Sequence, residues 1–112
     1  MKASNTQTQM RKGILEFCIL HIISRGEVYA TDLIEELKSA QMLIVEGTLY
    51  PVLNRLKNSN LASYKWVESD LGPPRKYYSI TPEGLAFLND LHKTWKDLDN
   101  SVNQITTKAK KE

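Results

Sequence analysis

The chain has 112 residues, which is enough for one domain with a modest hydrophobic core and too few for two. Its formal net charge is only +2, so bulk charge alone does not indicate a nucleic-acid partner. One cysteine excludes an internal disulfide framework, the polar N-terminus lacks a signal-peptide pattern, and the longest apolar run is too short to cross a bilayer. We therefore expect a cytoplasmic protein with no membrane partner.

The first helix is expected over residues 9–24, after a polar segment (residues 1–8) that we expect to be frayed and able to become ordered on DNA. Apolar side chains, Ile14 and Phe17 among them, lie around most of the circumference of this helix. A helix that is apolar on nearly all sides needs cover on nearly all sides. A domain this small supplies cover for one face, so a second chain is expected to supply the rest. Gly26 is the expected left-handed cap.

A second helix is predicted over residues 31–40, after a short extended link through Val28 and Tyr29. Its apolar residues form one stripe and its acidic residues lie on the other side, which is typical of a helix with a structural role.

The third helix is predicted from residue 47 to about residue 58, with an apolar stripe that includes Leu49, Leu53 and Leu56. Since proline fits best in the first turn of a helix, Pro51 predicts that Gly47 or Thr48 is the cap. The opposite face carries no acid, which favours an anionic partner. The candidate DNA contacts on this helix are Thr48, Tyr50, Pro51, Asn54 and Arg55.

A hairpin is predicted next, with strands over residues 61–68 and 76–81 and a proline-stiffened connection longer than a tight turn. Arg75 and Lys76 leave this connection as adjacent cations and are candidate contacts to the DNA backbone. Trp66 is expected in the core. Residues 47–81 carry five cations and two acids, and a helix followed by a basic hairpin is typical of a winged helix-turn-helix.

The last helix is predicted from Pro82 to about residue 107, with Thr81 as its cap. Its apolar residues recur at heptad spacing, which predicts a seam for another helix. The first helix of a partner subunit is the expected occupant of this seam. The predicted dimer interface consists of Ile14, Phe17, Leu88, Leu91, Trp95, Leu98, Val102 and Ile105.

Motifs of enzymes and metal sites are absent from the sequence. There is no phosphate-binding loop, zinc-protease motif or nucleophile elbow, so no catalytic residue or enzymatic activity is expected. Cys18 and His21 have a spacing that could share a metal, but no second pair completes four ligands. No metal and no cofactor is predicted.

Three motifs carry a family resemblance: GTLYPVLNRL (residues 47–56), GPPRKYYSIT (residues 72–81) and PEG (residues 82–84). Together they resemble the PadR family of bacterial transcriptional regulators. The resemblance implies a homodimer that binds operator DNA as a repressor, with the C-terminal helix packed across the first helix of the partner. The positions that match the recognition helix and the wing of the family are Thr48, Tyr50, Asn54, Arg55, Arg75 and Lys76.

Some short members of this family are drug sensors that stack planar drugs on a tryptophan of the C-terminal helix. Trp95 stands at a similar position, and Asp99 one turn later could attract a cationic ligand. The alternative is that Trp95 only fills the dimer interface.

The expected fold is mainly α with a two-stranded β-hairpin wing. Residues 1–81 are expected to form a winged helix-turn-helix and residues 82–112 a dimerisation helix and tail, together as one compact unit. The expected partners are double-stranded DNA with an inverted-repeat operator and a second copy of the chain. If the chain is a drug sensor, a small aromatic ligand is a third expected partner. The alternative is a winged-helix module that binds protein and not DNA, against which the cationic exposed face argues.

Overall fold

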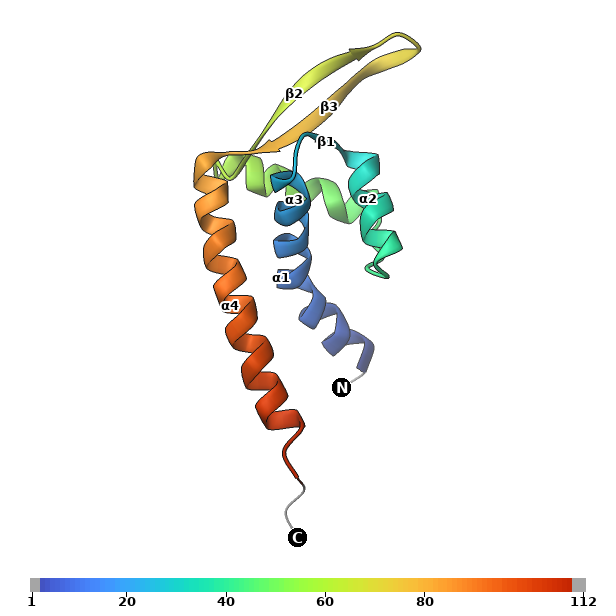
Figure 1. The fold of residues 1–112 in the computed structure, drawn as a ribbon. Helices are drawn as coiled ribbons and strands as arrows, with labels where there is room; N and C mark the ends of the chain where they lie inside the picture. The colour runs from blue at the N-terminus through green and yellow to red at the C-terminus, as the bar shows by residue number, and fades with distance from the viewer. Residues whose placement is uncertain (1–2, 110–112) are drawn as a thin grey trace.

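The computed structural model of the chain describes residues 3–109. In this part of the chain four helices and three strands follow one another in the order α1 (Ala3–Ser24), β1 (Val28–Tyr29), α2 (Ala30–Ser39), α3 (Glu46–Asn58), β2 (Ala62–Ser69), β3 (Gly72–Ile80) and α4 (Pro82–Thr106). Figure 1 shows the β2–β3 hairpin, called the wing below, projecting at one end and α4 running from its base to the opposite end. The expected mainly α architecture with a winged helix-turn-helix is confirmed.

The sheet has three strands and not the two that we expected. β1 pairs antiparallel with β3, so the strand order is β1-β3-β2. Val28 lies opposite Tyr78, and Tyr29 lies opposite Tyr77. The sequence could not reveal β1, because two residues are too few to show the alternation of a strand.

The wing turns more tightly than we expected. β2 ends at Ser69 and β3 begins at Gly72, so only two residues connect them. The predicted loop prolines, Pro73 and Pro74, lie within β3. The register shifts by one residue between Val67 and Ser69, which places an extra residue in β3. Such an irregularity accommodates prolines, because a proline has no N–H to donate to the ladder.

The core lies where the second half of α1, α2, α3 and the base of the sheet meet. Its largest fully buried side chains are Tyr78, Ile19, Leu20, Ile23, Leu33, Leu49, Leu53 and Leu56. The apolar stripe predicted for α3 is therefore buried. Of the two adjacent tyrosines in β3, only Tyr78 is buried, as strand alternation requires.

Helix α1 begins at Ala3, so most of the segment that we expected to be frayed is helical. Residues 3–9 contain no glycine or proline, and the Thr8 hydroxyl donates a hydrogen bond to the Ser4 carbonyl oxygen at 3.0 Å, one turn earlier. Residues 1 and 2 lie outside the described residues. At the other end of α1, Gly26 adopts a φ of +149°, a conformation that favours glycine.

Helix α3 begins earlier than the position of Pro51 suggested. Its N-cap is Val45, and no side chain caps it, so the prediction of Gly47 or Thr48 as the cap was wrong. Pro51 lies inside the helix, in its second turn. The helix continues through Pro51 without the one hydrogen bond that a backbone N–H there would donate to the carbonyl of Gly47.

Helix α4 begins as the sequence indicated, since the Thr81 hydroxyl oxygen accepts a hydrogen bond from the Gly84 N–H at 2.9 Å. The first half of α4 packs on α1 of the same chain, where the rings of Phe17 and His92 lie 5.8 Å apart. Leu88 therefore lies in the core of the protomer, with 6% exposed, and is not available to the predicted seam. Among residues 3–109, no helix combines the length and the apolar character needed to cross a bilayer.

Candidate nucleic-acid interface

The outer surface of α3 is free of the protomer core. All five candidate DNA contacts on this helix are exposed: Thr48, Tyr50, Pro51, Asn54 and Arg55. At about 100° per residue, Pro51 and Asn54 point outward, Tyr50 lies on one edge, and Thr48 and Arg55 lie on the other. The helix thus offers a central face and two edges with different neighbours.

The first edge of α3 meets the wing. A groove of about 420 Å³, called the wing groove below, is lined by Tyr29, Ala30, Tyr50, Trp66, Pro73, Pro74, Arg75 and Lys76. The structure therefore brings the predicted wing cations and Tyr50 to one site, although about 25 residues of chain separate them. Cations and aromatic hydroxyls on one concave surface can bind the sugar-phosphate backbone of DNA.

Aromatic rings position both wing cations. Arg75 and Lys76 are neighbours in β3 and make different contacts: the Arg75 guanidinium lies 4.8 Å from the centre of the Tyr29 ring. The Lys76 ammonium lies 4.3 Å from the centre of the Tyr64 ring and 5.3 Å from that of Trp66. Ring faces attract cations without neutralising their charge, so both side chains are pre-oriented while still able to bind an anion.

The expectation that Trp66 lies in the core was wrong, because its side chain is 61% exposed. Trp66 lies opposite Lys76 in the ladder and lines the open wing groove, where its ring contacts the Lys76 ammonium and is not covered by the core. The sequence analysis also did not include Tyr29 among the candidate site residues, although it lines the wing groove. No local pattern marked Tyr29, since its contact with Arg75 depends on the pairing of β1 with β3.

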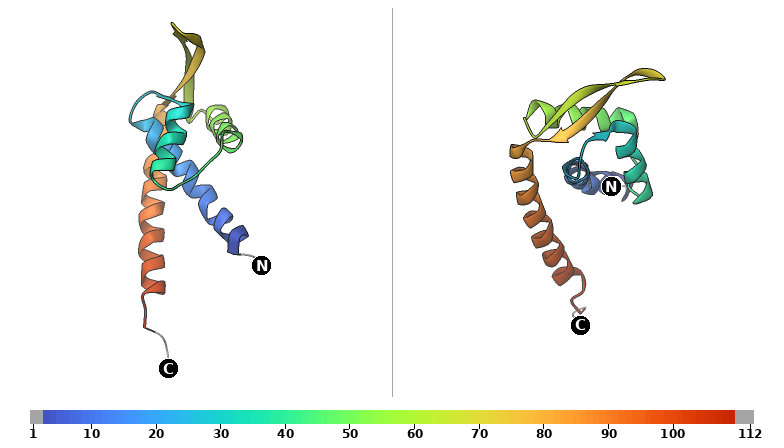
Figure 2. Two further views of the ribbon diagram at one scale, coloured as in Figure 1. Left: turned by 90° about the vertical axis from the view of Figure 1, so that its right-hand side faces the viewer. Right: turned by 45° about the horizontal axis from the view of Figure 1, so that its top comes forward.

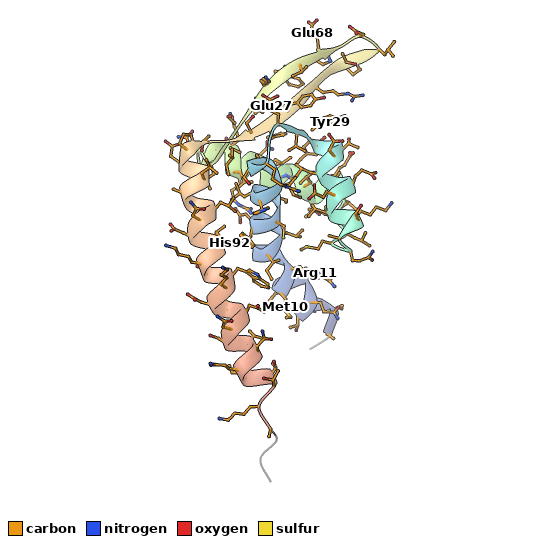
Figure 3. All side chains as sticks on the ribbon, viewed as in Figure 1. Met10, Arg11, Glu27, Tyr29, Glu68 and His92 are labelled. Carbon is orange, nitrogen blue, oxygen red and sulfur yellow. The ribbon has the colours of Figure 1, made fainter. Side chains whose placement is uncertain are left out.

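One of the cations counted in the sequence is partly neutralised. The Lys65 ammonium lies 2.9 Å from a carboxylate oxygen of Glu27, in an ion pair that joins β2 to the segment before β1. Figure 3 shows Glu27 and Tyr29 near the base of the wing. This ion pair leaves Arg75 and Lys76 as the wing cations that line the groove.

The second edge of α3 faces α1. Here the Arg55 guanidinium lies 3.1 Å from a carboxylate oxygen of Glu16. Both side chains keep contact with water, with 57% of Arg55 and 27% of Glu16 exposed, so we expect the pair to contribute about 0–1 kcal/mol. Arg55 can therefore leave Glu16 for a stronger anionic partner at little cost.

Burial at the base of the wing changes the acidity of one tyrosine. The pKa of Tyr78 is raised above its usual value of 10, first because burial disfavours the phenolate and second because Tyr50 and Tyr64 lie nearby. The Tyr78 phenol is therefore neutral at physiological pH, and the groove gains no negative charge from it.

The candidate ligand and dimer residues lie away from α3. Trp95 lines two apolar grooves: one of about 350 Å³ where α1, α2 and α4 meet, with Phe17, Cys18 and His92, and one of about 390 Å³ between α1 and α4, with Ile14, Leu91 and Leu98. Asp99 does not line either groove and instead accepts a hydrogen bond from the Asn103 amide at 3.4 Å. Of the other predicted seam residues on α4, Leu91 is half-buried against the core, and Leu98, Val102 and Ile105 are exposed.

Comparison with known proteins identifies the family. The model of the transcriptional regulator PadR-like family matches residues 19–90, more than half of the chain. The chain belongs to the PadR-like family. The resemblance carried by the three sequence motifs is thereby confirmed. This membership makes the chain a DNA-binding transcription regulator and not an enzyme.

Solved structures of PadR-like proteins share both fold and length with this chain. A PadR-like transcription factor from Bacteroides fragilis is 53% identical, covers 91% of this chain and 99% of its own, and superposes with a TM-score of 0.78. A PadR-like transcriptional regulator from Bacillus cereus is 39% identical, with coverages of 90% and 99% and a TM-score of 0.80. A PadR family regulator from Eggerthella lenta is 29% identical, with coverages of 95% and 93% and a TM-score of 0.84.

An uncharacterized protein of Lysinibacillus sphaericus is 30% identical over 94 residues, which cover 81% of this chain and 86% of that protein. The span that matches the PadR-like family includes α3 and the wing, with every candidate DNA contact named above. Trp95 and Asp99 lie beyond this span. The family therefore supports the DNA-binding assignment more directly than it supports a ligand site.

Proposed function

We propose that this PadR-like regulator is a dimeric repressor that places α3 in the major groove of an inverted-repeat operator and grips the DNA backbone with the wing. The observation that carries this proposal is the wing groove, where Tyr50 of α3 and the wing cations Arg75 and Lys76 line one concave surface. Residues 1–81 supply the DNA-binding part and residues 82–112 the dimerisation part.

Within this arrangement the side chains divide by chemistry. Asn54 and Arg55 contact base edges, because an amide pairs bidentately with adenine and a guanidinium with guanine. Thr48, Tyr50, Arg75 and Lys76 contact phosphates, and Pro51 packs against the groove surface. Phosphate contacts set the register of the protein on the duplex, whereas base contacts select the sequence.

The exposed apolar residues of α4 support the dimer. Leu98, Val102 and Ile105 are 54%, 52% and 76% exposed, and they continue the heptad spacing beyond the part of α4 that packs on α1. In the proposed dimer these residues pack on the partner, together with Ile14 and Trp95. Two copies of α3 then reach half-sites about one helical turn apart.

Fluorescence anisotropy tests DNA binding, with duplex DNA from upstream of the gene for this protein and an unrelated duplex, each at several salt concentrations. The wild type should bind the upstream DNA more tightly. Arg75→Ala should weaken binding to both duplexes and flatten the salt dependence, whereas Asn54→Ala should reduce the preference between them. Lys96→Ala, an exposed cation on α4, is the control for loss of one positive charge. Absence of binding at low salt would instead favour the protein-binding alternative.

Light scattering tests the dimer. Leu98→Asp should convert the dimer to a monomer and weaken operator binding, because the carboxylate would be buried in an apolar interface. Asn100→Asp introduces the same charge two residues away and serves as the matched control. A wild-type monomer at micromolar concentration, or a footprint with a single half-site, would contradict the proposed arrangement.

We also propose that a planar aromatic ligand releases the repressor by stacking on Trp95. The two apolar grooves that share Trp95 support this proposal, whereas the position of Asp99 does not support a role for its carboxylate. Since Trp66 is exposed and would also fluoresce, quenching by planar cationic dyes is best compared between the wild type and Trp95→Ala, in which only the fluorescence of Trp66 remains. Equal quenching in the two proteins would remove Trp95 as the platform.

A further inference from the structure

The N-terminal half of α1 has no role in the core. Every side chain from residue 3 to residue 14 is exposed, and the buried part of this helix begins near its middle. In the left view of Figure 2, α1 slants so that its N-terminal end lies on the same side of the molecule as α3, and α4 lies on the other side. In that view α3 has the wing above it and the N-terminal half of α1 below it.

This half of α1 is cationic. Arg11 and Lys12 are the charged residues between positions 3 and 13, and the others are mostly hydroxyl and amide side chains. Figure 3 shows Arg11 near the lower end of α1, on the opposite side of α3 from Tyr29 and the wing. A helix surface with cations, hydroxyls and amides and no acid is complementary to the phosphates of nucleic acid.

Two grooves connect these cations to the second edge of α3. Lys12 lines a groove of about 580 Å³ together with Thr48 and Arg55. Arg11 and Lys12 line an adjoining groove with Thr48 and with Lys38 of α2. Thr48 borders both grooves, so the cations of α1 continue the candidate nucleic-acid interface rather than forming a separate patch.

An α-helix in the major groove of DNA has one phosphate backbone on each side, since the groove is about 12 Å wide and a helix with its side chains nearly fills it. The wing provides cations on only one side of α3. We propose that Arg11 and Lys12 of α1 bind phosphates of the backbone opposite to the one that the wing binds. This inference rests on the proposed placement of α3 in the major groove. It adds phosphate contacts on the side of α3 opposite to the wing.

The acidic residue at the second edge of α3, Glu16, does not prevent Arg11 and Lys12 from binding phosphate. Glu16 lines the same groove as Lys12, but its carboxylate is paired with Arg55 at 3.1 Å. The two charges of this pair cancel at a distance, and Lys12 remains to attract phosphate. Arg11 lines the groove that does not include Glu16.

The test is the salt dependence of operator binding by the double variant Arg11→Ala/Lys12→Ala. Loss of two phosphate contacts should reduce the slope of log K against log salt by about two for each bound protomer, and weaken binding by at least about tenfold at low salt. The preference for upstream over unrelated DNA should stay unchanged, because phosphate contacts do not select sequence. Lys93→Ala/Lys96→Ala removes the same net charge from exposed positions of α4 and should leave the slope near that of the wild type.

Each outcome decides the inference. A salt slope for Arg11→Ala/Lys12→Ala equal to that of the α4 control would overturn it, while a retained effect of Arg75→Ala in the same assay would leave the proposed function standing. Absence of DNA binding by the wild-type protein would contradict both this inference and the proposed function. A change of oligomeric state by light scattering in place of a change in slope would assign the α1 cations to a protein interface and also overturn the inference.

Hydroxyl-radical footprinting provides a second readout. The wild type should protect sugars on both backbones that flank each α3, and Arg11→Ala/Lys12→Ala should lose protection only on the side opposite to the wing. Arg75→Ala should show the converse pattern. Loss of protection on the wing side by the α1 variant would contradict the assignment.

Discussion

Glu16 of α1 and Arg55 of α3 form an ion pair, with 3.1 Å between Oε2 and Nη2. The two residues are 39 positions apart in the chain. The pair engages a guanidinium that has the right chemistry to contact guanine or phosphate, so in the proposed complex Glu16 and DNA would compete for the Arg55 side chain. Both partners are partly hydrated, which keeps this competition weak.

The variant Glu16→Gln should bind DNA more tightly than the wild type. Arg55 would no longer have to leave a carboxylate, and one negative charge near the interface would be removed. Since a partly exposed ion pair contributes about 0–1 kcal/mol, the gain should be at most about fivefold for each bound protomer and should shrink as salt rises. Anisotropy titrations measure it. Glu36→Gln, which breaks the pair with Arg25 elsewhere on the protomer, is the control, and unchanged or weaker binding by Glu16→Gln would refute the competition.

The variant Gly84→Ala should destabilise the fold. A Cβ at this position would overlap the carbonyl oxygen of Leu61 and lie 2.7 Å from Cγ1 of Ile80, where α4 begins against the end of the sheet. Because the obstacle is backbone, relief requires movement of α4, and the free energy of unfolding should fall by about 1–3 kcal/mol or more. Urea denaturation followed by circular dichroism measures the loss.

Gly13→Ala is the matched control for this substitution. Gly13 lies within α1, and a Cβ there would meet no atom within 4 Å. Alanine should therefore raise the free energy of unfolding by about 0.5–1 kcal/mol through its better helix propensity. Equal stability changes for the two substitutions would contradict the contact between α4 and Leu61.

Alkaline pH should destabilise the protein through Tyr78. Burial raises the pKa of this phenol above 10, so at lower pH it is protonated in both folded and unfolded states. As pH rises through 10, the phenol ionises first in the unfolded chain, which lowers the free energy of unfolding until the folded pKa is reached. Tyr78→Phe should therefore lose less stability than the wild type between pH 9 and 11, a range set by the usual pKa of about 10. Parallel pH dependences of the two proteins would refute this linkage.

The thiol of Cys18 should react slowly in the folded protein. Burial raises the pKa of this thiol above 9.0, and its sulfur lies 3.9 Å from that of Met42. Because the thiolate is the reactive species, alkylation by iodoacetamide near pH 8 should be slower for the native protein than for protein unfolded in urea. Mass spectrometry of the alkylated fraction over time measures both rates. Equal rates would mean that Cys18 is more accessible than the fold indicates.

Part of the candidate nucleic-acid interface could be predicted from the sequence because it depends on local periodicity. Burial of Leu49, Leu53 and Leu56 follows from their three- and four-residue spacing, and the same spacing assigns the polar side chains of α3 to the outside. The start of α4 was equally local, since the Thr81 cap and Pro82 act within a single turn.

Other features depended on pairings across the chain. The position of Tyr29 under Arg75 requires β1 to join the sheet, and the exposure of Trp66 follows from its place in the open wing groove. Leu88 has the heptad spacing of the seam but lies in the core of the protomer, because α1 of the same chain covers that part of α4. Periodicity shows that a face is apolar and does not show what covers it.

The sequence by itself determined the fold class, the family and the chemistry of α3 and the wing, because these rest on short motifs whose spacing carries their physical meaning. Only the tertiary structure decided which charges meet. It joined Arg55 to Glu16, brought Tyr50 to the wing cations, and placed Arg11 and Lys12 beside the second edge of α3. Electrostatic interactions act through space over a few ångströms, and the sequence order of these residues contains no record of those distances.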